Sequence, residues 1–232
     1  MKNRILNSRS TTREQLRRRQ GSRSIRERVL IVCEGAKTER LYLEAVVAHL
    51  RLTSADVVVA ADCPSAPRHV VEHAKKLVVQ EGPPSQGGYD FVYCVFDRDT
   101  HHSYNSARDQ IIALNKSRKF FAKSIEAIYS IPCFEYWFLL HFVYKRSPLV
   151  DSNGNSCGEV AVRELMKINT FENYRKSICP AHIAALIENI DRAKSNSIRA
   201  SRDAVRTGEA NPSTNMHILI TKLESIAPPK KP

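Results

Sequence analysis

The sequence lacks the usual marks of a cysteine-based metal site, of a secreted protein and of a membrane protein. None of its six cysteines forms a Cys-x-x-Cys pair, and no pair of histidines complements them as zinc ligands. The basic amino-terminal residues do not lead into the apolar stretch of a secretory signal, and no segment approaches the ~18 apolar residues of a membrane span. These absences predict a reduced, cytoplasmic protein that does not enter a membrane.

Acidic residues are also scarce relative to basic ones. The chain has 36 lysines and arginines against 24 aspartates and glutamates, which gives a net charge of +12. Residues 1–28 carry ten of the basic residues and two of the acidic ones, so this segment alone contributes +8. An excess of positive charge favours a polyanionic partner, most simply nucleic acid. Two further interpretations stay open: a tail that docks on a partner protein, or charge that serves only solubility.

Apolar residues make up 42% of the chain and follow an alternation of strand and helix patterns. Short apolar runs rich in β-branched residues predict strands, and apolar positions at helical spacing predict the helices between them. The predicted strands span 29–33, 56–61, 90–96 and 124–131, and the helices between them 38–50, 67–78 and 104–119. Thr38 is expected to cap the first helix. This alternation predicts an α/β fold with a mostly parallel four-stranded sheet flanked by helices.

The carboxyl-terminal part of the chain is predicted to be helical. A buried helix is expected over residues 132–142, followed by helices over 158–168, 180–195 and 213–226. The predicted organisation is a basic flexible arm (1–27), an α/β domain (28–146), a helical extension (147–226) and a tail (227–232).

Acidic residues stand at the ends of two predicted strands. The apolar run from Val29 to Cys33 is typical of a strand buried on both faces, and it ends at Glu34-Gly35. A second buried strand ends at Asp97-Arg-Asp99. Open α/β sheets bind their ligands at such carboxyl ends, and Mg²⁺ or Mn²⁺ prefers carboxylate oxygens. If the two strands are neighbours, Glu34, Asp97 and Asp99 converge as metal ligands with an open face for phosphate; the alternative is that Asp-x-Asp only caps a turn.

Two glutamates at helix starts are further candidates. Glu39 lies in the first turn of the helix that follows the first strand, where the helix dipole alone favours an acid. Glu135 also lies near a helix start, among the aromatic neighbours Phe134, Trp137 and Phe138. Active-site duty is the functional interpretation of both residues, and a dipole-stabilised surface acid is the alternative.

Three residues are candidates for contacting substrate. Lys37, in the strand-to-helix turn, can meet a phosphate, although exposed lysines are common. Arg98 lies between the two aspartates but is expected to point to the other side of the strand. His141 lies in an apolar helix, where a core histidine with satisfied hydrogen bonds competes with general acid/base chemistry. His101 and His102 follow the aspartates and can reach the same site.

Four segments resemble one known family. They are Val32-Cys-Glu-Gly-Ala-Lys-Thr-Glu39, Val95-Phe-Asp-Arg-Asp99, Ile131-Pro-Cys-Phe-Glu-Tyr-Trp-Phe-Leu-Leu-His-Phe142 and Asn211-Pro-Ser-Thr214. Together they resemble the RloB-like family, which includes the AbiLii proteins, and the resemblance covers about residues 28–226. The Glu-Gly and Asp-x-Asp strand ends also look like a Toprim domain, a Rossmann-like fold shared with OLD-family nucleases.

The resemblance implies a function that the residue pattern alone does not. It implies that residues 28–146 form a Toprim nuclease-like domain, that Glu39 and Glu135 sit where OLD-like relatives place further acids for two metals, and that the protein acts in phage defence beside an ATPase of the AAA or ABC type. Thr100 departs from the pattern, because many relatives carry an acid there. Independently of the resemblance, a homo-oligomer of this chain is a further expectation.

The sequence supports three hypotheses. The first is a Mg²⁺- or Mn²⁺-dependent endonuclease of DNA or RNA, with transfer RNA among its candidate substrates. Its catalytic residues would be Glu34, Glu39, Asp97, Asp99 and Glu135. The second is a non-catalytic Toprim subunit that binds or regulates an ATPase. The third, a nucleotidyl transferase, is disfavoured because the sequence contains no second catalytic module.

Overall fold

The computed structural model describes residues 27–35, 37–60, 66–98, 103–117, 119–150 and 156–229. Its first half alternates strands and helices: β1 (Val29–Cys33), α2 (Thr38–His49), β2 (Val57–Ala60), α3 (Pro67–Glu81), the 3₁₀ turn η1 (Pro84–Gln86), β3 (Phe91–Asp97), α4 (Ser103–Lys116) and β4 (Ser124–Ile131). Its second half is mainly helical: α5 (Glu135–Leu140), α6 (Cys157–Leu165), the 3₁₀ turn η2 (Asn169–Phe171), α7 (Pro180–Glu188), α8 (Ile190–Thr207), β5 (Ser213–Thr214) and α9 (Met216–Ile226).

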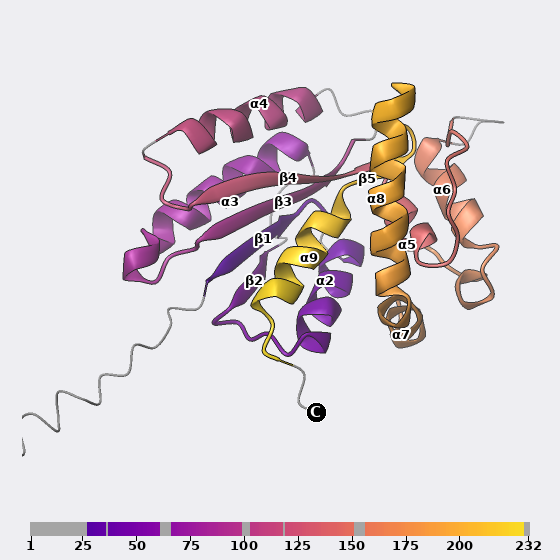
Figure 1. Cartoon of the computed structure of the whole chain (residues 1–232), viewed down its shortest axis with the longest axis horizontal. Coiled ribbons are helices and arrows are strands. Elements are labelled where there is room, and N and C mark those ends of the chain that lie inside the picture. The colour runs from indigo at the N-terminus through magenta and orange to yellow at the C-terminus, as the bar shows by residue number, and fades with distance from the viewer. Residues whose placement is uncertain are drawn as a thin grey trace, which may run out of the picture.

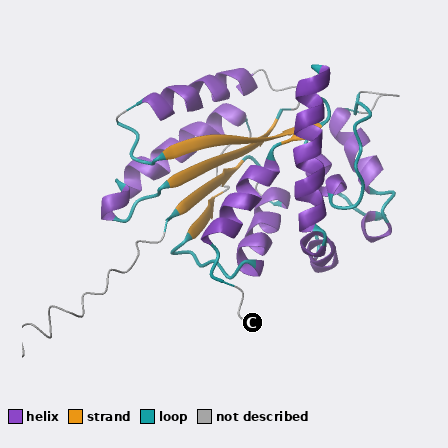
Figure 2. Ribbon diagram, in the orientation of Figure 1, coloured by secondary structure: helices purple, strands orange, loops and turns teal. Residues whose placement is uncertain are grey.

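The predicted α/β fold is confirmed, with one strand more than expected. The sheet has the order β2-β1-β3-β4-β5, in which β5 is antiparallel to β4 and the other neighbours are parallel. Helices α3 and α4 cover one face, and α2 and α9 cover the other (Figure 1). The ribbon in Figure 2 shows the same layers, with the helices enclosing the twisted strands. The strand order reverses between β1 and β3, which is where open α/β sheets form their ligand crevice.

Side chains of the central strands alternate between two cores. In β3, Tyr93 and Val95 face the core that contains α2 and α9, whereas Cys94 and Phe96 face α3 and α4. This period of two continues past the strand end. It places Asp97 on the α2 side of the sheet and Arg98 on the opposite side.

The predicted domain and the predicted helical extension share one core. Buried residues of β1, α2 and β3 pack in the same cluster as Leu165, Phe171 and Leu186, and as apolar residues of α9. The fifth strand, β5, also comes from the carboxyl-terminal part of the chain and pairs with β4. The helical extension therefore completes the sheet.

Two asparagine side chains and β5 satisfy the outer edge of β4. Asn115 of α4 accepts a hydrogen bond from the N–H of Ile125 (2.9 Å) and donates to its carbonyl (2.8 Å). Asn215 accepts from the Tyr129 N–H (2.7 Å) and donates to the Ala127 carbonyl (2.9 Å). The register Ile131↔Ser213 then continues the pairing into β5. Side-chain amides thus substitute for a full neighbouring strand.

Several predicted boundaries were wrong for local physical reasons. The last helix begins at Met216 rather than 213, because Ser213 and Thr214 pair with β4. The predicted helix 180–195 is two helices, since Asn189 (φ −102°, ψ 14°) breaks the helical backbone, and α8 runs on to a left-handed Gly208. Thr38 does not cap α2; its hydroxyl donates to the Lys176 carbonyl (2.9 Å).

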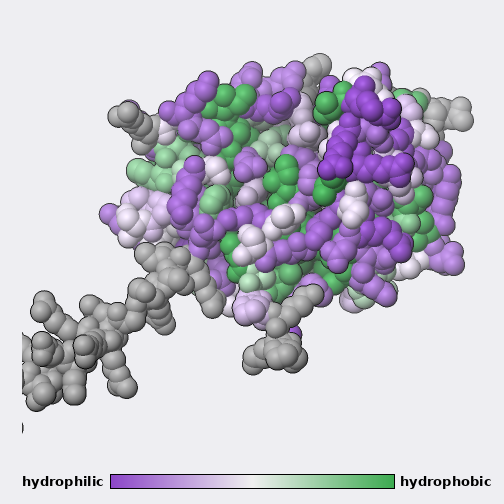
Figure 3. All heavy atoms as spheres, in the orientation of Figure 1, coloured by the Kyte–Doolittle hydropathy of each residue, from purple (hydrophilic) through white to green (hydrophobic). Residues whose placement is uncertain are grey.

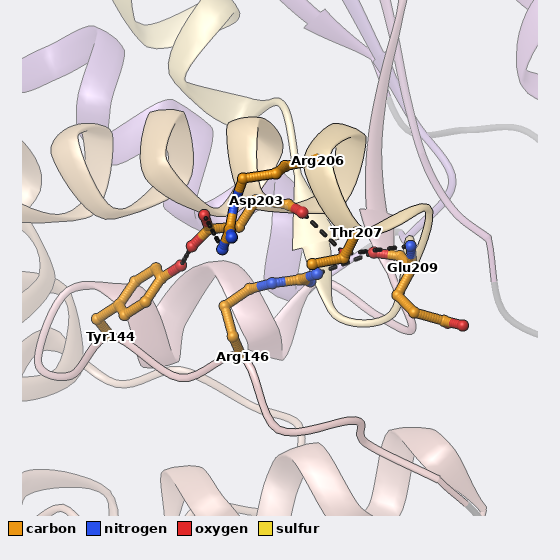
Figure 4. Close-up of polar contacts among 6 residues, drawn as sticks. All are labelled: Tyr144, Arg146, Asp203, Arg206, Thr207 and Glu209. Atoms are coloured by element: carbon orange, nitrogen blue, oxygen red, sulfur yellow. Dashed lines mark hydrogen bonds and ion pairs between the residues drawn. The ribbon is translucent and has the colours of Figure 1, made fainter.

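Hydrogen bonds join the chain after α5 to the end of α8. Figure 4 shows Tyr144 donating to the Asp203 carboxylate, which also pairs with Arg206 at 3.2 Å. Arg146 donates to the Pro212 carbonyl. It also donates, at 2.9 Å, to the Glu209 carbonyl (Figure 4). These contacts fix the turn that leads from α8 into β5.

Three of the five basic residues of α8 are engaged within the protein. Arg199 lies 3.9 Å from the centre of the Tyr144 ring, and Lys194 pairs with Glu224 at 2.7 Å. The surface over α8 is hydrophilic in Figure 3. Part of the positive charge of α8 is therefore balanced within the protein.

No helix in the part of the chain that the structure describes is long and apolar enough to cross a membrane.

The role of Asn215 at the β4 edge is testable. We expect Asn215→Ala to lower the free energy of unfolding by about 1–3 kcal/mol, because it leaves partly buried backbone groups of Ala127 and Tyr129 without partners. Urea denaturation would measure the change. Asn173→Ala is the matched control, since the Asn173 amide is exposed and bonds only its neighbour Glu172. Equal stability of the two variants would contradict this account of the edge.

Candidate functional site

Glu34 and Asp97 lie side by side at the carboxyl edge of the sheet. The Glu34 N–H donates to the Val95 carbonyl (3.0 Å), which extends the β1–β3 pairing by one residue. The Glu34 carboxylate then accepts a hydrogen bond from the backbone N–H of Asp97 (3.2 Å). The predicted convergence of these two strand ends is therefore confirmed.

Glu39 reaches this pair from the first turn of α2. Its carboxylate lies directly over Gly35, where the Cβ of any other residue would collide with it. The pKa of Glu39 is raised to about 7: burial is the largest cause and the charges of Glu135 and Glu34 add to it, while a backbone hydrogen bond acts in the opposite direction. The glycine of the Glu-Gly pair thus leaves room for the second glutamate.

Asp97 is affected by the same causes as Glu39. Burial raises the pKa of its carboxyl well above the usual range, and the charges of Glu39, Glu135 and Glu34 act in the same direction. A hydrogen bond from the Phe134 backbone opposes this pKa shift. These charge effects indicate that the carboxyl groups of Glu34, Glu39, Asp97 and Glu135 lie within electrostatic reach of one another. We call Glu34, Glu39, Asp97 and Glu135 the carboxylate cluster.

Glu135 is held at the start of α5 by a tyrosine from a distant segment. The Tyr174 hydroxyl donates to its carboxylate at 3.1 Å, and both residues are buried. The Cys133 thiol lies beside it: burial raises its pKa, and so do the charges of Glu135 and Asp97. Glu135 is therefore an oriented, buried carboxylate rather than a surface acid.

The structure describes two of the three predicted metal ligands, Glu34 and Asp97. Within the described ranges, no three side chains of His, Cys, Asp and Glu are grouped as ligands of a single ion. Asp99, with Thr100, His101 and His102, lies outside the described residues. The predicted ligand set of Glu34, Asp97 and Asp99 thus stays a prediction.

Comparison with known proteins decides the family. The sequence model of the family described as RloB-like protein matches residues 29–223, most of the chain. The chain belongs to the RloB-like family. No curated protein and no solved structure matches it.

Two of the three candidate substrate-binding residues of this RloB-like chain are exposed. Lys37 precedes α2 and is exposed at the same edge as the cluster. Arg98 is exposed too, but its guanidinium carbon lies 5.6 Å from the centre of the Tyr104 ring of α4. Arg98 therefore turns away from Asp97, as strand alternation predicts.

His141 lies in the core of the RloB-like chain. It is fully buried, its Nδ1 lies 2.9 Å from the Trp137 carbonyl, and its Nε2 lies 3.2 Å from the Tyr42 hydroxyl. Burial lowers its pKa to about 3, so the ring is neutral. The structure therefore favours the core-histidine interpretation over contact with substrate.

Sequence reasoning missed two residues of the site. Tyr174 bonds Glu135, and the charge of Lys176 lowers the pKa of Glu39. Both follow the short turn η2, in a segment without a recognisable motif. Only the packing of this segment against α2 and α5 brings them to the cluster, so a spacing pattern cannot reveal them.

The raised pKa of Glu39 predicts how stability depends on pH in the metal-free RloB-like protein. Folding raises this pKa from 4.5 to about 7, so the contribution of Glu39 to stability is greatest below pH 4.5 and is lost as the pH rises to about 7. We expect Glu39→Gln to flatten this decline and to be more stable than the parent above pH 7.

Urea denaturation across this pH range, with EDTA present, would measure the effect. Glu44→Gln is the matched control, because it removes a carboxyl from the same helix outside the cluster. A Glu39→Gln variant that is less stable than the parent above pH 7 would contradict the electrostatic account.

Proposed function

We propose that this protein is a Mg²⁺- or Mn²⁺-dependent endonuclease of the Toprim type. The observation that carries the proposal is the carboxylate cluster, which gathers Glu34, Glu39, Asp97 and Glu135 at the switch point of a parallel sheet. Hydrolysis of a phosphodiester needs oxygen ligands and a proton acceptor at one place, and the cluster offers both.

The chemistry of the cluster fits a hard divalent cation. All four side chains supply oxygen ligands, and the negative charges of Glu34, Glu39 and Glu135 each raise the pKa of at least one other carboxyl group of the cluster. A bound cation would offset this repulsion. Glu34 and Asp97, with Asp99, are the residues that would hold it; when bound, it would polarise a phosphoryl oxygen and acidify water.

The chain's own residues have distinct parts in this proposal. Glu39, with a pKa near 7, is suited to accept a proton from the attacking water. Tyr174 fixes the carboxylate of Glu135 by a hydrogen bond, which orients it toward the cluster. The Glu34 carboxylate is fixed in the same way by the Asp97 N–H.

Membership in the RloB-like family supports the wider biological proposal. We propose that the substrate is DNA or RNA, that an AAA- or ABC-type ATPase is the partner, and that the nuclease is the effector of an anti-phage system. The net charge of +12 fits a polyanionic substrate.

The alternative is a Toprim-like subunit that binds and regulates an ATPase without cutting nucleic acid. This non-catalytic alternative differs from the nuclease in its response to loss of Asp97.

We expect Asp97→Asn to reduce Mn²⁺-dependent cleavage of plasmid, single-stranded DNA or transfer RNA by at least ~100-fold, because it removes a central carboxylate while keeping the side-chain volume. Gel assays with purified protein, alone and with its ATPase, would measure the loss. Asp109→Asn, on the exposed surface of α4, is the matched control. If the parent protein cuts none of these substrates and Asp97→Asn still protects cells from phage, the nuclease proposal fails.

A further inference from the structure

A cleft of about 480 Å³ opens beside the carboxylate cluster. Helix α6 forms one wall with Glu159, Val162, Arg163 and Met166 at its end, and the segment Tyr174–Lys176 forms the other. The functions assigned to the cluster make no use of this space.

Two contacts tie the cleft to the cluster. Tyr174 lines the cleft and donates its hydroxyl hydrogen bond to Glu135. The carbonyl of Lys176 accepts from the hydroxyl of Thr38, the residue before Glu39. The wall of the cleft is therefore bonded to both helices that carry glutamates of the cluster.

The walls of the cleft are predominantly positive. Arg163, Arg175 and Lys176 are exposed, against the single acid Glu159. Glu159 is already engaged, because it forms a capping box with Ser156 at the start of α6. A phosphodiester that is cleaved at the carboxylate cluster is itself an anion and has to approach these acids. Three cations beside the cluster would attract it.

Between these cations the cleft offers apolar surface. Val162 and Met166 are half-buried, and the Arg175 guanidinium lies 3.7 Å from the Met166 sulfur. A base stacked inside a duplex cannot reach such a surface, whereas an unpaired base can lie on it while its phosphates meet the cations.

The segment that carries the cations is firmly held. Phe171 and Tyr174 are buried, and the ring of His182 stacks on Phe171 at 4.4 Å. Lys176 adopts a left-handed backbone (φ 55°), which non-glycine residues rarely do. A fixed segment loses little conformational entropy when it binds a ligand.

We propose that this cleft binds an unpaired nucleotide of the substrate strand, with Arg163 and Arg175 on its phosphates and Val162 and Met166 beneath its base. The inference rests on the proposed nuclease function and adds a preference for single-stranded or looped nucleic acid next to the cut.

The test is binding in EDTA, where no cleavage occurs. Fluorescence anisotropy would compare the full-length parent with Arg163→Gln/Arg175→Gln on single-stranded DNA, single-stranded RNA and duplex DNA over a range of salt. Each lost phosphate contact should lower the slope of log K against log salt by ~0.7 on single strands, so about 1.4 for the double variant. Affinity for the duplex should change little. The matched control is Lys75→Gln/Lys76→Gln, which removes the same charge from exposed positions on α3, across the sheet.

Each outcome decides the inference. A selective loss on DNA or RNA single strands supports it and identifies the preferred strand. A loss equal to that of the control pair, or equal on single strands and duplex, overturns it. Mn²⁺-dependent cleavage by the parent is measured separately: selective binding without any cleavage would keep the cleft and reject the nuclease. Thermal unfolding of both double variants would show that each is folded.

Discussion

The hydrogen bond from the Asp97 backbone to the Glu34 carboxylate sets the geometry of the whole site. Strand β1 ends at Cys33, whereas β3 continues to Asp97. Beyond the end of β1, the Glu34 side chain replaces the backbone as the hydrogen-bond acceptor for β3. Because the Glu34 carboxylate is the acceptor, this hydrogen bond fixes Glu34 at the switch point of the sheet. The donor is the backbone N–H of Asp97, so the second acid lies next to the first. The positions of Glu39 and Glu135 are then set by the helices that follow β1 and β4.

Aromatic packing holds these helices together against the repulsion of their acids. Tyr42 of α2 makes edge contacts with Phe134, Trp137 and Phe138 at centroid distances of 5.9, 6.4 and 5.3 Å. Such pairs contribute about 0.5–1.5 kcal/mol each beyond their burial. The same two helices carry Glu39 and Glu135, whose charges oppose each other. The aromatic contacts of the α5 region thus offset the electrostatic repulsion among the acids of the carboxylate cluster.

Sequence patterns predicted the parts of this structure that depend on local regularity. Strands β1 and β3 could be predicted because each is a continuous apolar run. The acids at their ends lie together because neighbouring parallel strands end at the same edge of the sheet. Strand β5 gave no such signal, since two residues carry no periodicity and their pairing depends on Asn215 and on contacts of α8. The roles of Tyr174 and Lys176 could not be predicted either. Both residues are far from Glu135 along the chain, and only tertiary packing brings them close to it. His141 could be interpreted in two ways until its burial was known.

The asparagine contacts along β4 also bear on how copies of this chain could meet. An extended peptide that adds to a sheet needs a row of free N–H and C=O groups, and Asn115, Asn215 and β5 occupy that row from Ile125 to Ile131. On this side the sheet offers only the two-residue outer flank of β5. Among the described strands, only Val57–Ala60 of β2 leaves a longer flank, so edge-to-edge joining of sheets would have to start there.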